Sequence, residues 1–414
     1  MQWLMKAFGT FGSSVGVTLN PEGGLVTVHS IPHRIWFWMR RHVFAAAIAF
    51  SLPCAALPPP PPTTFPLSSP RLAVLGSSPA RGIFDPSLLA TGNAAFPYAL
   101  AFSEVHATSN ISTALAAFDV ALGAFVRVGA ANAADGPATF PCVDGAPCAA
   151  TLIHEVPSLA ADPADPDPAR AVKVFSHSYL VLPGDALHYE LGFISLHSAP
   201  TLSGPFTAQP LLGWASSSPL STAGVAQVLT DLPQLADCLA FSEPGAALTP
   251  AGALLLALTC ISAPRAPEPE ARIRVVLLSS DDHGASWRYA GLALDGGEAA
   301  ALGNYSSPQV SAPAVFFGAR GEPLLAVSPS APLWGGFEGY AGCAIVGLTA
   351  DLAGVVRDAA GAPVVRAVVV PDGVAFNGAC TAAPGNASAL GDLYVSVLLP
   401  DGIFSIVRTD FRPA

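Results

Sequence analysis

Short apolar runs separated by turn residues recur along the chain from about residue 71 onward. In four places a run opens with an x-Pro pair and leads, after a turn, into a second apolar run. The four pairs are DPSLL (85–89) with YALAFS, VPSLA (156–160) with VKVFSHSY, EPGAAL (243–248) with ALLLALTC, and APAVFF (312–317) with EPLLAVSP. Runs this short, bounded by Gly, Pro and Asp, predict strands rather than helices.

The opening prolines give the pattern a period. Pro86, Pro157, Pro244 and Pro313 are separated by 71, 87 and 69 residues. Proline at the head of a strand removes a backbone donor only where the ladder has not begun, so we expect each unit to start a strand there. A weaker fifth copy, FNGACT followed by DLYVSVLLP and IFSIVRTD, lies near the C-terminus.

Strand clusters at this spacing predict a radial repeat. Five units within residues 71–414 favour an all-β domain, a five-bladed β-propeller. A β-sandwich or a pair of barrels is the alternative, but neither explains a proline at the start of each unit. With 51% hydrophobic and 11% charged residues, the chain has ample material for a core, and 41 Pro and 38 Gly supply the turns.

The N-terminal region has a different character. Residues 1–56 are expected to be an extension that ends in a secretory signal: a basic segment at Met39–Arg41, the ten apolar residues Val43–Leu52, and small residues at Cys54–Ala56. Ten residues are too few to span a bilayer, and a short core or membrane helix is the alternative. Residues 57–70 contain five consecutive prolines and predict a linker, which leaves 71–414 for the propeller.

The charge balance restricts the partners. The formal net charge is −11 at pH 7, and residues 1–56 hold four basic residues against Glu22 alone, so the remainder is still more acidic. Such a chain repels nucleic acid and anionic membranes, because phosphate binding needs clustered Lys and Arg. We expect no nucleic-acid partner, no membrane association after signal removal, and a monomer.

The cysteines indicate an oxidising compartment. Six follow Cys54, and an even number behind a signal favours disulfides in a secreted protein. A short loop would pair Cys142 with Cys148 and a hairpin Cys238 with Cys260, which leaves Cys343 with Cys380. Acceptor sequons for N-glycosylation stand at Asn110, Asn304 and Asn386. No Cys/His spacing indicates zinc, so we expect no metal site and no cofactor, although a structural or channel-bound Ca²⁺ stays open.

The stretch SSDDHGASW at 279–287 crowds acids, a histidine and serines together. It resembles the sialidase-type Asp-box, S-x-D-x-G-x-[ST]-W, through Ser280, Asp282, Gly284, Ser286 and Trp287. The resemblance implies that the Asp accepts hydrogen bonds within a hairpin turn, Gly supplies backbone freedom and Trp packs between strands. We interpret the stretch as a turn between the third and fourth strands of unit three, without a catalytic role.

Candidate chemistry follows from propeller geometry. The first strand of each blade lines the central channel and the second returns antiparallel, so the starts of first strands and the ends of second strands share one face. Starts of first strands supply three candidate catalytic carboxylates, Asp85, Glu155 and Glu243. The same geometry selects candidate substrate-binding residues, which are His154, His177, Tyr179 and Glu104. A buried, satisfied histidine is the alternative for His154 and His177.

The acid-bearing segments carry a family resemblance. DPSLL at Asp85, HEVPSL at Glu155 and SEPGAAL at Glu243 resemble five-bladed propeller glycosidases of the arabinanase, levansucrase and invertase superfamily (glycoside hydrolase families 43, 68 and 32). The resemblance implies a hydrolase acting on carbohydrate, with Asp85 as base or nucleophile and Glu243 as general acid. It implies that Glu155 orients the substrate and raises the pKa of the acid.

Several alternatives stay beside this interpretation. Aligning the prolines places Val156, not Glu155, opposite Asp85 and Glu243, and a one-residue offset in a strand reverses the side-chain direction. Asp85 and Glu243 are also common turn residues before proline. As functions, a non-catalytic extracellular propeller that binds glycan or protein and a sialidase are the alternatives; a sialidase should show several Asp-boxes and an arginine cluster.

Overall fold

The computed structural model of the protein describes residues 15–19, 25–30, 63–65, 71–107, 110–132, 136–141, 147–182, 186–214, 224–262, 272–303, 309–318, 320–330, 340–371, 376–382 and 393–409. The chain divides into two compact units, Met1–Leu57 and Pro58–Ala414. In the first unit, β1 (Val15–Leu19) and β2 (Leu25–Ser30) form an antiparallel pair. The predicted signal at 39–56 lies outside the described residues.

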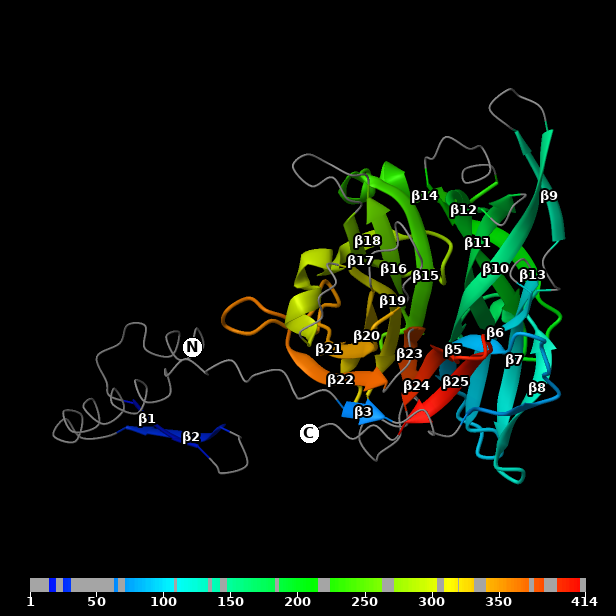
Figure 1. Cartoon of the computed structure of the whole chain (residues 1–414). Helices are drawn as coiled ribbons and strands as arrows, with labels where there is room; N and C mark the ends of the chain where they lie inside the picture. Colours follow the sequence, from blue (N-terminus) through cyan, green and yellow to red (C-terminus); the bar gives the residue numbers. More distant parts are fainter. Residues whose placement is uncertain are drawn as a thin grey trace. The chain divides into compact units, whose positions relative to one another are not determined.

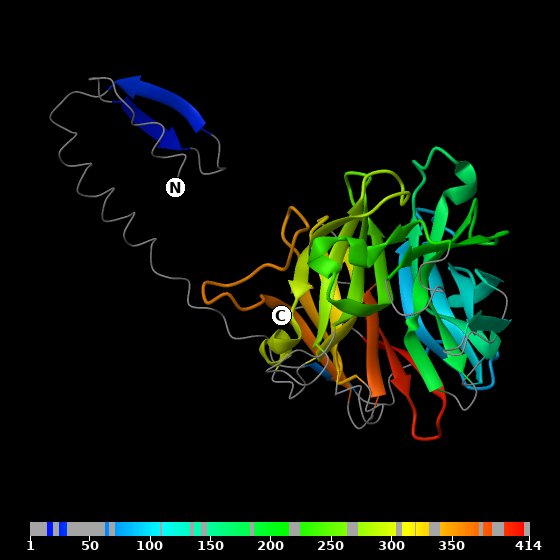
Figure 2. The same cartoon turned by 90° about the horizontal axis from the view of Figure 1, so that it is seen from above.

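The second unit is a five-bladed β-propeller, which confirms the fold predicted from the repeats (Figures 1 and 2). Blade 1 contains β5 (Ile83–Ala90), β6 (Tyr98–Ala107), β7 (Asn110–Asp119), β8 (Ala124–Ala130) and β4 (Val74–Leu75), in that order from the axis outward. Blade 2 contains β10 (Pro147–Ala161), β11 (Val172–Leu182), β12 (Ala186–Ala199), β13 (Thr207–Gly213) and β14 (Gln227–Val228), with β9 (Gly136–Pro141) on the free side of β10.

The other three blades follow the same meander. Blade 3 contains β15 (Cys238–Leu248), β16 (Leu254–Ser262), β17 (Arg272–Ser280) and β18 (Arg288–Leu294). Blade 4 contains β19 (Gln309–Phe317), β20 (Pro323–Ser330), β21 (Cys343–Gly347), β22 (Val365–Pro371) and β3 (Thr63–Phe65). Blade 5 contains β23 (Phe376–Ala382), β24 (Leu393–Leu398) and β25 (Phe404–Thr409). The innermost strands, β5, β10, β15, β19 and β23, contact one another in turn around the axis.

The ring is closed by chain segments far apart in sequence. Arg71 forms a bridge with Val407, and the Leu72 amide donates to the Ile406 carbonyl at 2.8 Å, so residues before blade 1 extend blade 5. Figure 1 shows β25 beside β5, the last strand beside the first strand of the ring. Part of the predicted linker, β3, pairs in parallel with β22 and belongs to the sheet of blade 4.

Apolar layers between neighbouring blades form the core. Between blades 2 and 3, for example, Phe175, Trp214 and Phe241 are fully buried, and the Trp214 and Phe241 rings lie 5.7 Å apart. Similar layers fill the other four blade interfaces. Because each blade buries both faces against its neighbours, the alternating pattern of a half-exposed strand gives way to almost continuous apolar runs such as LLLAL in β16.

The prolines do not stand at the strand heads, and that expectation was wrong. Pro86 is the fourth residue of β5, and the pairing with β6 jumps there from Phe84 opposite Ser103 to Ser87 opposite Ala101. The other innermost strands skip residues in the same way. A β-bulge leaves the intervening residues outside the ladder, so the missing N–H of proline costs no hydrogen bond.

Two of the three expected disulfides lie entirely within the described residues and are confirmed. Cys238 and Cys260 join β15 to β16, with Cα atoms 5.7 Å apart. Cys343 and Cys380 join β21 of blade 4 to β23 of blade 5, with Cα atoms 6.3 Å apart. Cys142 lies outside the described residues, as do Asn304 and Asn386, whereas Asn110 is exposed at the start of β7. Among the described residues, no helix has the length and apolar character needed to cross a membrane.

The SSDDHGASW stretch is a turn between β17 and β18. Asp282 Oδ1 accepts from Ser280 Oγ at 2.7 Å and from the Ser286 amide at 2.9 Å, and Ser286 Oγ donates to Oδ2 at 2.6 Å. Hydrogen bonds from Ser286 and Ser280 lower the pKa of Asp282 to about 2. Trp287 is 4% exposed and lies edge-on to Phe175. The carboxylate of Asp282 is therefore engaged in its own turn.

Candidate functional site: an acidic cluster on the propeller axis

Each bulge holds one non-glycine residue in the left-handed backbone region. The five residues occupy equivalent positions and have φ values of 51° at Asp85, 52° at Val156, 53° at Glu243, 48° at Ala312 and 48° at Ala379. Such a conformation is uncommon for residues with a side chain and persists only where the surroundings enforce it. Residues of all five bulges line a small cavity of about 20 Å³ on the axis, room for about one water.

Hydrogen bonds across blade interfaces fix three of these bulges. The amides of Asp85, Val156 and Ala379 each donate to a serine Oγ on the second strand of the preceding blade. The acceptors are Ser396 at 2.9 Å, Ser103 at 3.3 Å and Ser328 at 2.9 Å, respectively. Because each of these bonds crosses a blade interface, the positions of the axial residues are set by the whole ring and not by one loop.

Asp85 is the most buried of the three candidate acids. Its side chain is buried, and Oδ2 accepts from Ser103 Oγ at 3.1 Å. Burial, followed by the negative charge of Glu155, raises the pKa of Asp85 well above its ordinary value, and the charge of Glu243 adds to the rise. Hydrogen bonds from Ser103 and the Val156 amide oppose the shift without cancelling it. Asp85 therefore holds a proton in a pH range where an ordinary aspartate has lost it.

Glu243 is held by the same kind of contacts from blades 3 and 4. Its Oε2 accepts from Thr259 Oγ1 at 2.8 Å and from the Ala312 amide at 2.8 Å, and Oε1 accepts from the Tyr340 hydroxyl. Burial raises the pKa of Glu243, while the hydrogen bonds from Tyr340, Ala312 and Thr259 act against the rise. At both acids, a hydroxyl of the same blade and an amide of the next blade face the carboxyl group.

Glu155 lies one residue before the bulge position, which Val156 occupies. Its Oε1 accepts from the Tyr179 hydroxyl at 2.9 Å. The one-residue offset expected from the proline alignment is thus real, yet Glu155 still lies close enough for its charge to act on Asp85. The resemblance implies that this residue raises the pKa of Glu243, whereas the shift attributed to Glu155 falls on Asp85.

His177 and Tyr179 support the cluster from inside blade 2. His177 is 1% exposed, and its ring lies 4.8 Å from Tyr179 and 6.4 Å from Trp214. Burial, followed by the effect of His154, lowers the pKa of His177 to about 3, so its ring is neutral at neutral pH. Tyr179 is 3% exposed and holds Glu155 through its hydroxyl, while His177 packs against the Tyr179 ring, so neither side chain presents a surface to a ligand.

His154 faces a different set of partners. Its Nδ1 lies 2.7 Å from Ser178 Oγ, which in turn lies 2.9 Å from Ser195 Oγ, and the chain ends at the buried His197, whose Nε2 is 3.1 Å from Ser195 Oγ. Burial lowers the pKa of His154 to about 4. His154 is half-buried and neutral, and it connects the cluster region to a polar network inside blade 2.

Glu104 is not brought to the acidic cluster. Arg127 on β8 donates to both of its carboxylate oxygens, at 3.0 and 3.1 Å, and Ser77 Oγ donates to Oε1 at 2.6 Å. These contacts direct Glu104 along the sheet face of blade 1 toward its outer strands. The segment YALAFSEVHA contains no signal that Glu104 pairs with Arg127, which lies 23 residues away in sequence.

Two residues of the site, Thr259 and Tyr340, escaped the sequence analysis. Thr259 holds Glu243 from a second strand as Ser103 holds Asp85, and a hydroxyl residue recurring in second strands was the available signal. Tyr340 gave no signal, because its contact with Glu243 spans 97 residues. Gly378 makes room for it, since an added Cβ would lie 2.4 Å from Tyr340 Cβ.

Among the described residues, one group of side chains could hold a metal ion, and it is not part of the axial cluster. Asp162, Asp165 and His283 place ligand atoms within 4.8 Å of one another. Lys173, which is 0% exposed, places Nζ 3.5 Å from Asp162 Oδ2 and in contact with Asp165 Oδ2. The ammonium group already supplies a positive charge between the carboxylates, so the group is an ionic contact between blades 2 and 3.

The fold and the site together define a five-bladed β-propeller with an acidic cluster on its axis. No family model matches the sequence, and no curated protein matches it. Solved structures similar to the chain include glycoside hydrolases of families 43 and 32.

Three of these similar structures are the following. A thermostable family-43 glycoside hydrolase is 12% identical over 82% of this chain and 94% of its own, with a TM-score of 0.46. An endo-arabinase from Bacteroides thetaiotaomicron is 14% identical over 85% and 98%, with a TM-score of 0.45. A family-32 glycoside hydrolase from Bifidobacterium adolescentis is 11% identical over 83% and 57%, with a TM-score of 0.49. At these identities the likeness concerns the fold, and the chemistry rests on the contacts described above.

Proposed function

We propose that the protein hydrolyses a glycosidic bond of an extracellular carbohydrate with the carboxyl groups of its axial cluster. The observation that carries the proposal is that Asp85 and Glu243, from different blades, are held by equivalent donors, while Glu155 adds a third charge. Glycoside hydrolysis needs one carboxyl group that is protonated and one that is ionised, next to the same bond.

The surroundings of the two acids support a division of roles between them. Asp85 is the proton donor, because burial and two neighbouring negative charges favour its neutral form. Glu243 is the base or nucleophile, because the Tyr340 and Thr259 hydroxyls and the Ala312 amide favour its ionised form against the effect of burial. This assignment reverses the roles that the family resemblance implies. The sugar would lie at the mouth of the axis, since the cavity between the bulges is water-sized.

Secretion is part of the same proposal. Disulfides join β15 to β16 and blade 4 to blade 5, as expected for a protein that folds outside the cytosol. The segment 39–56 has the sequence pattern of a secretory signal.

A screen of neutral aryl glycosides and polysaccharides tests the proposal. The wild-type protein is expected to release aglycone or sugar from at least one of them, with a bell-shaped pH dependence. The rate falls at high pH as Asp85 loses its proton and at low pH as Glu243 gains one, and both limbs lie above the usual carboxyl range because both pKa values are raised.

The matched control for this screen is Asp281→Asn. Asp281 lies in the β17–β18 turn, where its side chain is 67% exposed and pairs with Arg288. The control is expected to keep wild-type rates. If the wild type were as inert as Asp85→Asn and Glu243→Gln on every substrate but retained glycans on an array, the protein would be a binding propeller and the hydrolase proposal would be wrong.

A further inference from the structure

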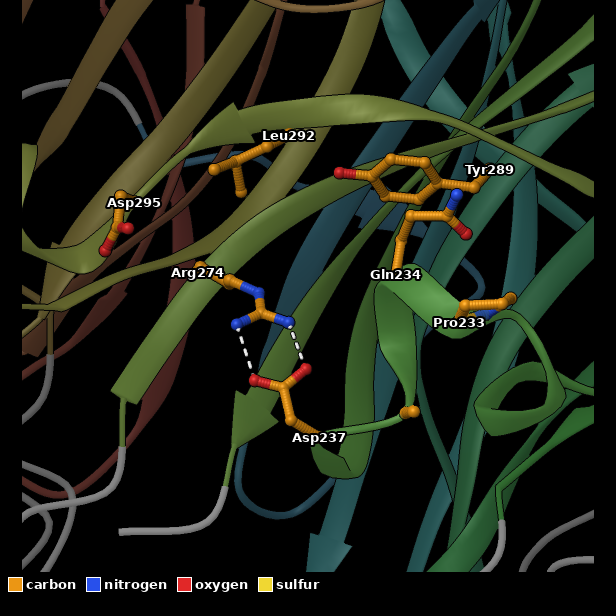
Figure 3. A pocket seen from close by; sticks show the side chains of 8 residues that line it. Pro233, Gln234, Asp237, Arg274, Tyr289, Leu292 and Asp295 are labelled. Atoms are coloured by element: carbon orange, nitrogen blue, oxygen red, sulfur yellow. Dashed lines mark hydrogen bonds and ion pairs between the residues drawn. The ribbon is translucent and has the colours of Figure 1, made fainter. Parts of the chain in front are cut away.

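Blade 3 carries a second, larger cavity on its outer strands, with a volume of about 490 Å³ (Figure 3). It lies between the outer strands β17 and β18 and the turns that precede β15 and follow β18. The residues that define it are Gln234, Asp237, Arg274, Tyr289, Leu292 and Asp295. Its volume is in the usual range of small-molecule sites.

A rigid ion pair forms one side of this blade-3 cavity. Arg274 Nη1 and Nη2 donate to the two carboxylate oxygens of Asp237 at 2.9 and 2.6 Å. The two side chains are only 13% and 20% exposed, so the planar pair is held in one orientation. Polar groups that are fixed before binding lose little entropy when a ligand arrives.

The charges around Arg274 exclude anions. The hydrogen bond from Arg274 to Asp237 raises the pKa of the guanidinium, burial opposes this, and the charges of Asp237 and Asp295 add to the rise. Two carboxylates therefore surround one guanidinium, within a chain whose net charge is −11. A phosphate or a uronic acid would be repelled, whereas a neutral ligand with many hydroxyl groups would find both donors and acceptors.

Apolar surface completes the cavity. Leu292 on the edge strand β18 is 37% exposed, and Tyr289 on the same strand is partly exposed. Figure 3 shows the Tyr289 ring and Leu292 over the Arg274–Asp237 pair, with Gln234 next to the tyrosine. An aromatic face next to fixed hydrogen-bonding groups suits a sugar ring, which has C–H faces and a rim of hydroxyl groups.

We infer that the blade-3 cavity is a second carbohydrate site, which binds about one or two neutral sugar rings of a polysaccharide. The choice of a polysaccharide rests on the proposed function of the axial cluster. A site on the outer strands of the blade would hold the polymer on the protein while a different part of it reaches the axis.

Retention of the protein by polysaccharides in affinity gel electrophoresis tests this inference. The full chain carrying Asp85→Asn, which slows turnover, is compared with the same chain carrying Tyr289→Ala or Gln234→Ala in addition. Arabinan, xylan and inulin serve as neutral probes and polygalacturonate as the anionic probe. Retention by at least one neutral probe is expected to weaken roughly threefold to tenfold in Tyr289→Ala, the effect of losing one aromatic contact, and less in Gln234→Ala.

The matched control is Phe96→Ala, which removes an aromatic ring of 41% exposure from blade 1 and is expected to leave retention unchanged. Thermal unfolding of each variant checks that it is folded. Equal retention of Tyr289→Ala and its parent, the absence of retention by every neutral probe, or retention by polygalacturonate alone would overturn the inference.

The two proposals fail in distinguishable ways. A small aryl glycoside reaches only the axial cluster, so Tyr289→Ala in the otherwise wild-type chain is expected to hydrolyse it at the wild-type rate. Failure of the wild type to hydrolyse any aryl glycoside would count against the axial chemistry, while the retention experiment would still decide the blade-3 cavity.

Discussion

Asp85→Asn is expected to lower kcat on a glycoside with an unactivated leaving group by roughly 10²- to 10⁴-fold, the usual contribution of a general acid. Asparagine keeps the size of the side chain, keeps an acceptor for the Ser103 hydroxyl, and tolerates the φ of 51° at this position. The substitution removes the acidic proton that Asp85 would donate to the leaving group. The check is to measure kcat on a series of glycosides that share the sugar found by the screen and differ in the pKa of the leaving group.

The leaving group separates the two roles. A dinitrophenyl group departs without a proton, so the loss in Asp85→Asn is expected to shrink to about tenfold or less on such a substrate. Glu243→Gln is expected to lose activity on both kinds of substrate, because its carboxylate acts on the other side of the reaction. If Glu243→Gln, and not Asp85→Asn, recovered activity on the dinitrophenyl substrate, Glu243 would be the proton donor and Asp85 the base or nucleophile. If both variants hydrolysed every substrate at the wild-type rate, the cluster would have no part in catalysis.

Unfolding of the Asp85→Asn variant would not explain its loss of activity. A carboxyl group whose pKa is raised in the folded protein binds its proton more tightly there, so its contribution to stability declines as the pH rises through the raised value. The neutral amide has no such decline. At neutral pH the variant is therefore expected to be at least as stable as the wild type in thermal unfolding.

Lys173→Met is expected to lower the free energy of unfolding by about 3–5 kcal/mol, the largest effect on stability that we expect from a single substitution. The lysine is fully buried, and its Nζ contacts Asp165, lies 3.5 Å from Asp162 and donates to the Arg170 carbonyl at 2.8 Å. Methionine fills a similar volume, so the loss arises from two buried carboxylates left without the ammonium group, with only the partly exposed Arg170 still 3.7 Å from Asp165 Oδ2. Urea unfolding at neutral pH measures the change.

The pH dependence distinguishes this cause from poor packing. Burial acts to raise the pKa of Asp165 and is the largest single effect, but the hydrogen bonds from Lys173 and the Asp167 amide and the charges of Lys173 and Arg170 together hold that pKa below its ordinary value. This contribution to stability is present above the ordinary pKa of an aspartate and is lost as the pH falls through the lowered one. The difference between wild type and Lys173→Met is therefore expected to narrow in acid.

Arg320→Met is the matched control for Lys173→Met. Arg320 pairs with Glu322 on the surface, and its side chain is 91% exposed, so the expected change is at most about 1 kcal/mol. A Lys173→Met variant that unfolded within 1 kcal/mol of the wild type, or whose deficit was constant down to low pH, would show that the ionic group does not stabilise the contact between blades 2 and 3.

The repeat pattern in the sequence was sufficient to predict the propeller. Pro86, Pro157, Pro244 and Pro313 mark the same bulge in four blades, and the apolar runs around them are the innermost strands. What the prolines do was predicted less well, because a break of the ladder inside a strand and the start of a strand look alike in sequence. The left-handed conformation that follows from the bulge has no signal in residues such as Val156 or Ala312.

The site was only partly visible in sequence, because its contacts cross blades. The pattern of first strands pointed to Asp85 and Glu243, whose positions the bulges set, and to Glu155 one residue away. Tyr340 could not be predicted as a partner of Glu243, and Glu104 could not be excluded, because Arg127 on another strand decides where its carboxylate points. The contact of Lys173 with two aspartates is equally hidden, although Lys173 is one of only two lysines in the chain.

The most direct measurement of the axial cluster is the titration of the Asp85 side-chain carboxyl carbon by ¹³C NMR in the wild type and in Glu155→Gln. We expect a wild-type pKa well above the ordinary aspartate value, and a lower pKa in Glu155→Gln because the second-largest cause of the shift is removed while burial remains. An Asp85 that titrates like an exposed aspartate, or one whose pKa is the same in both proteins, would contradict the proposed axial cluster.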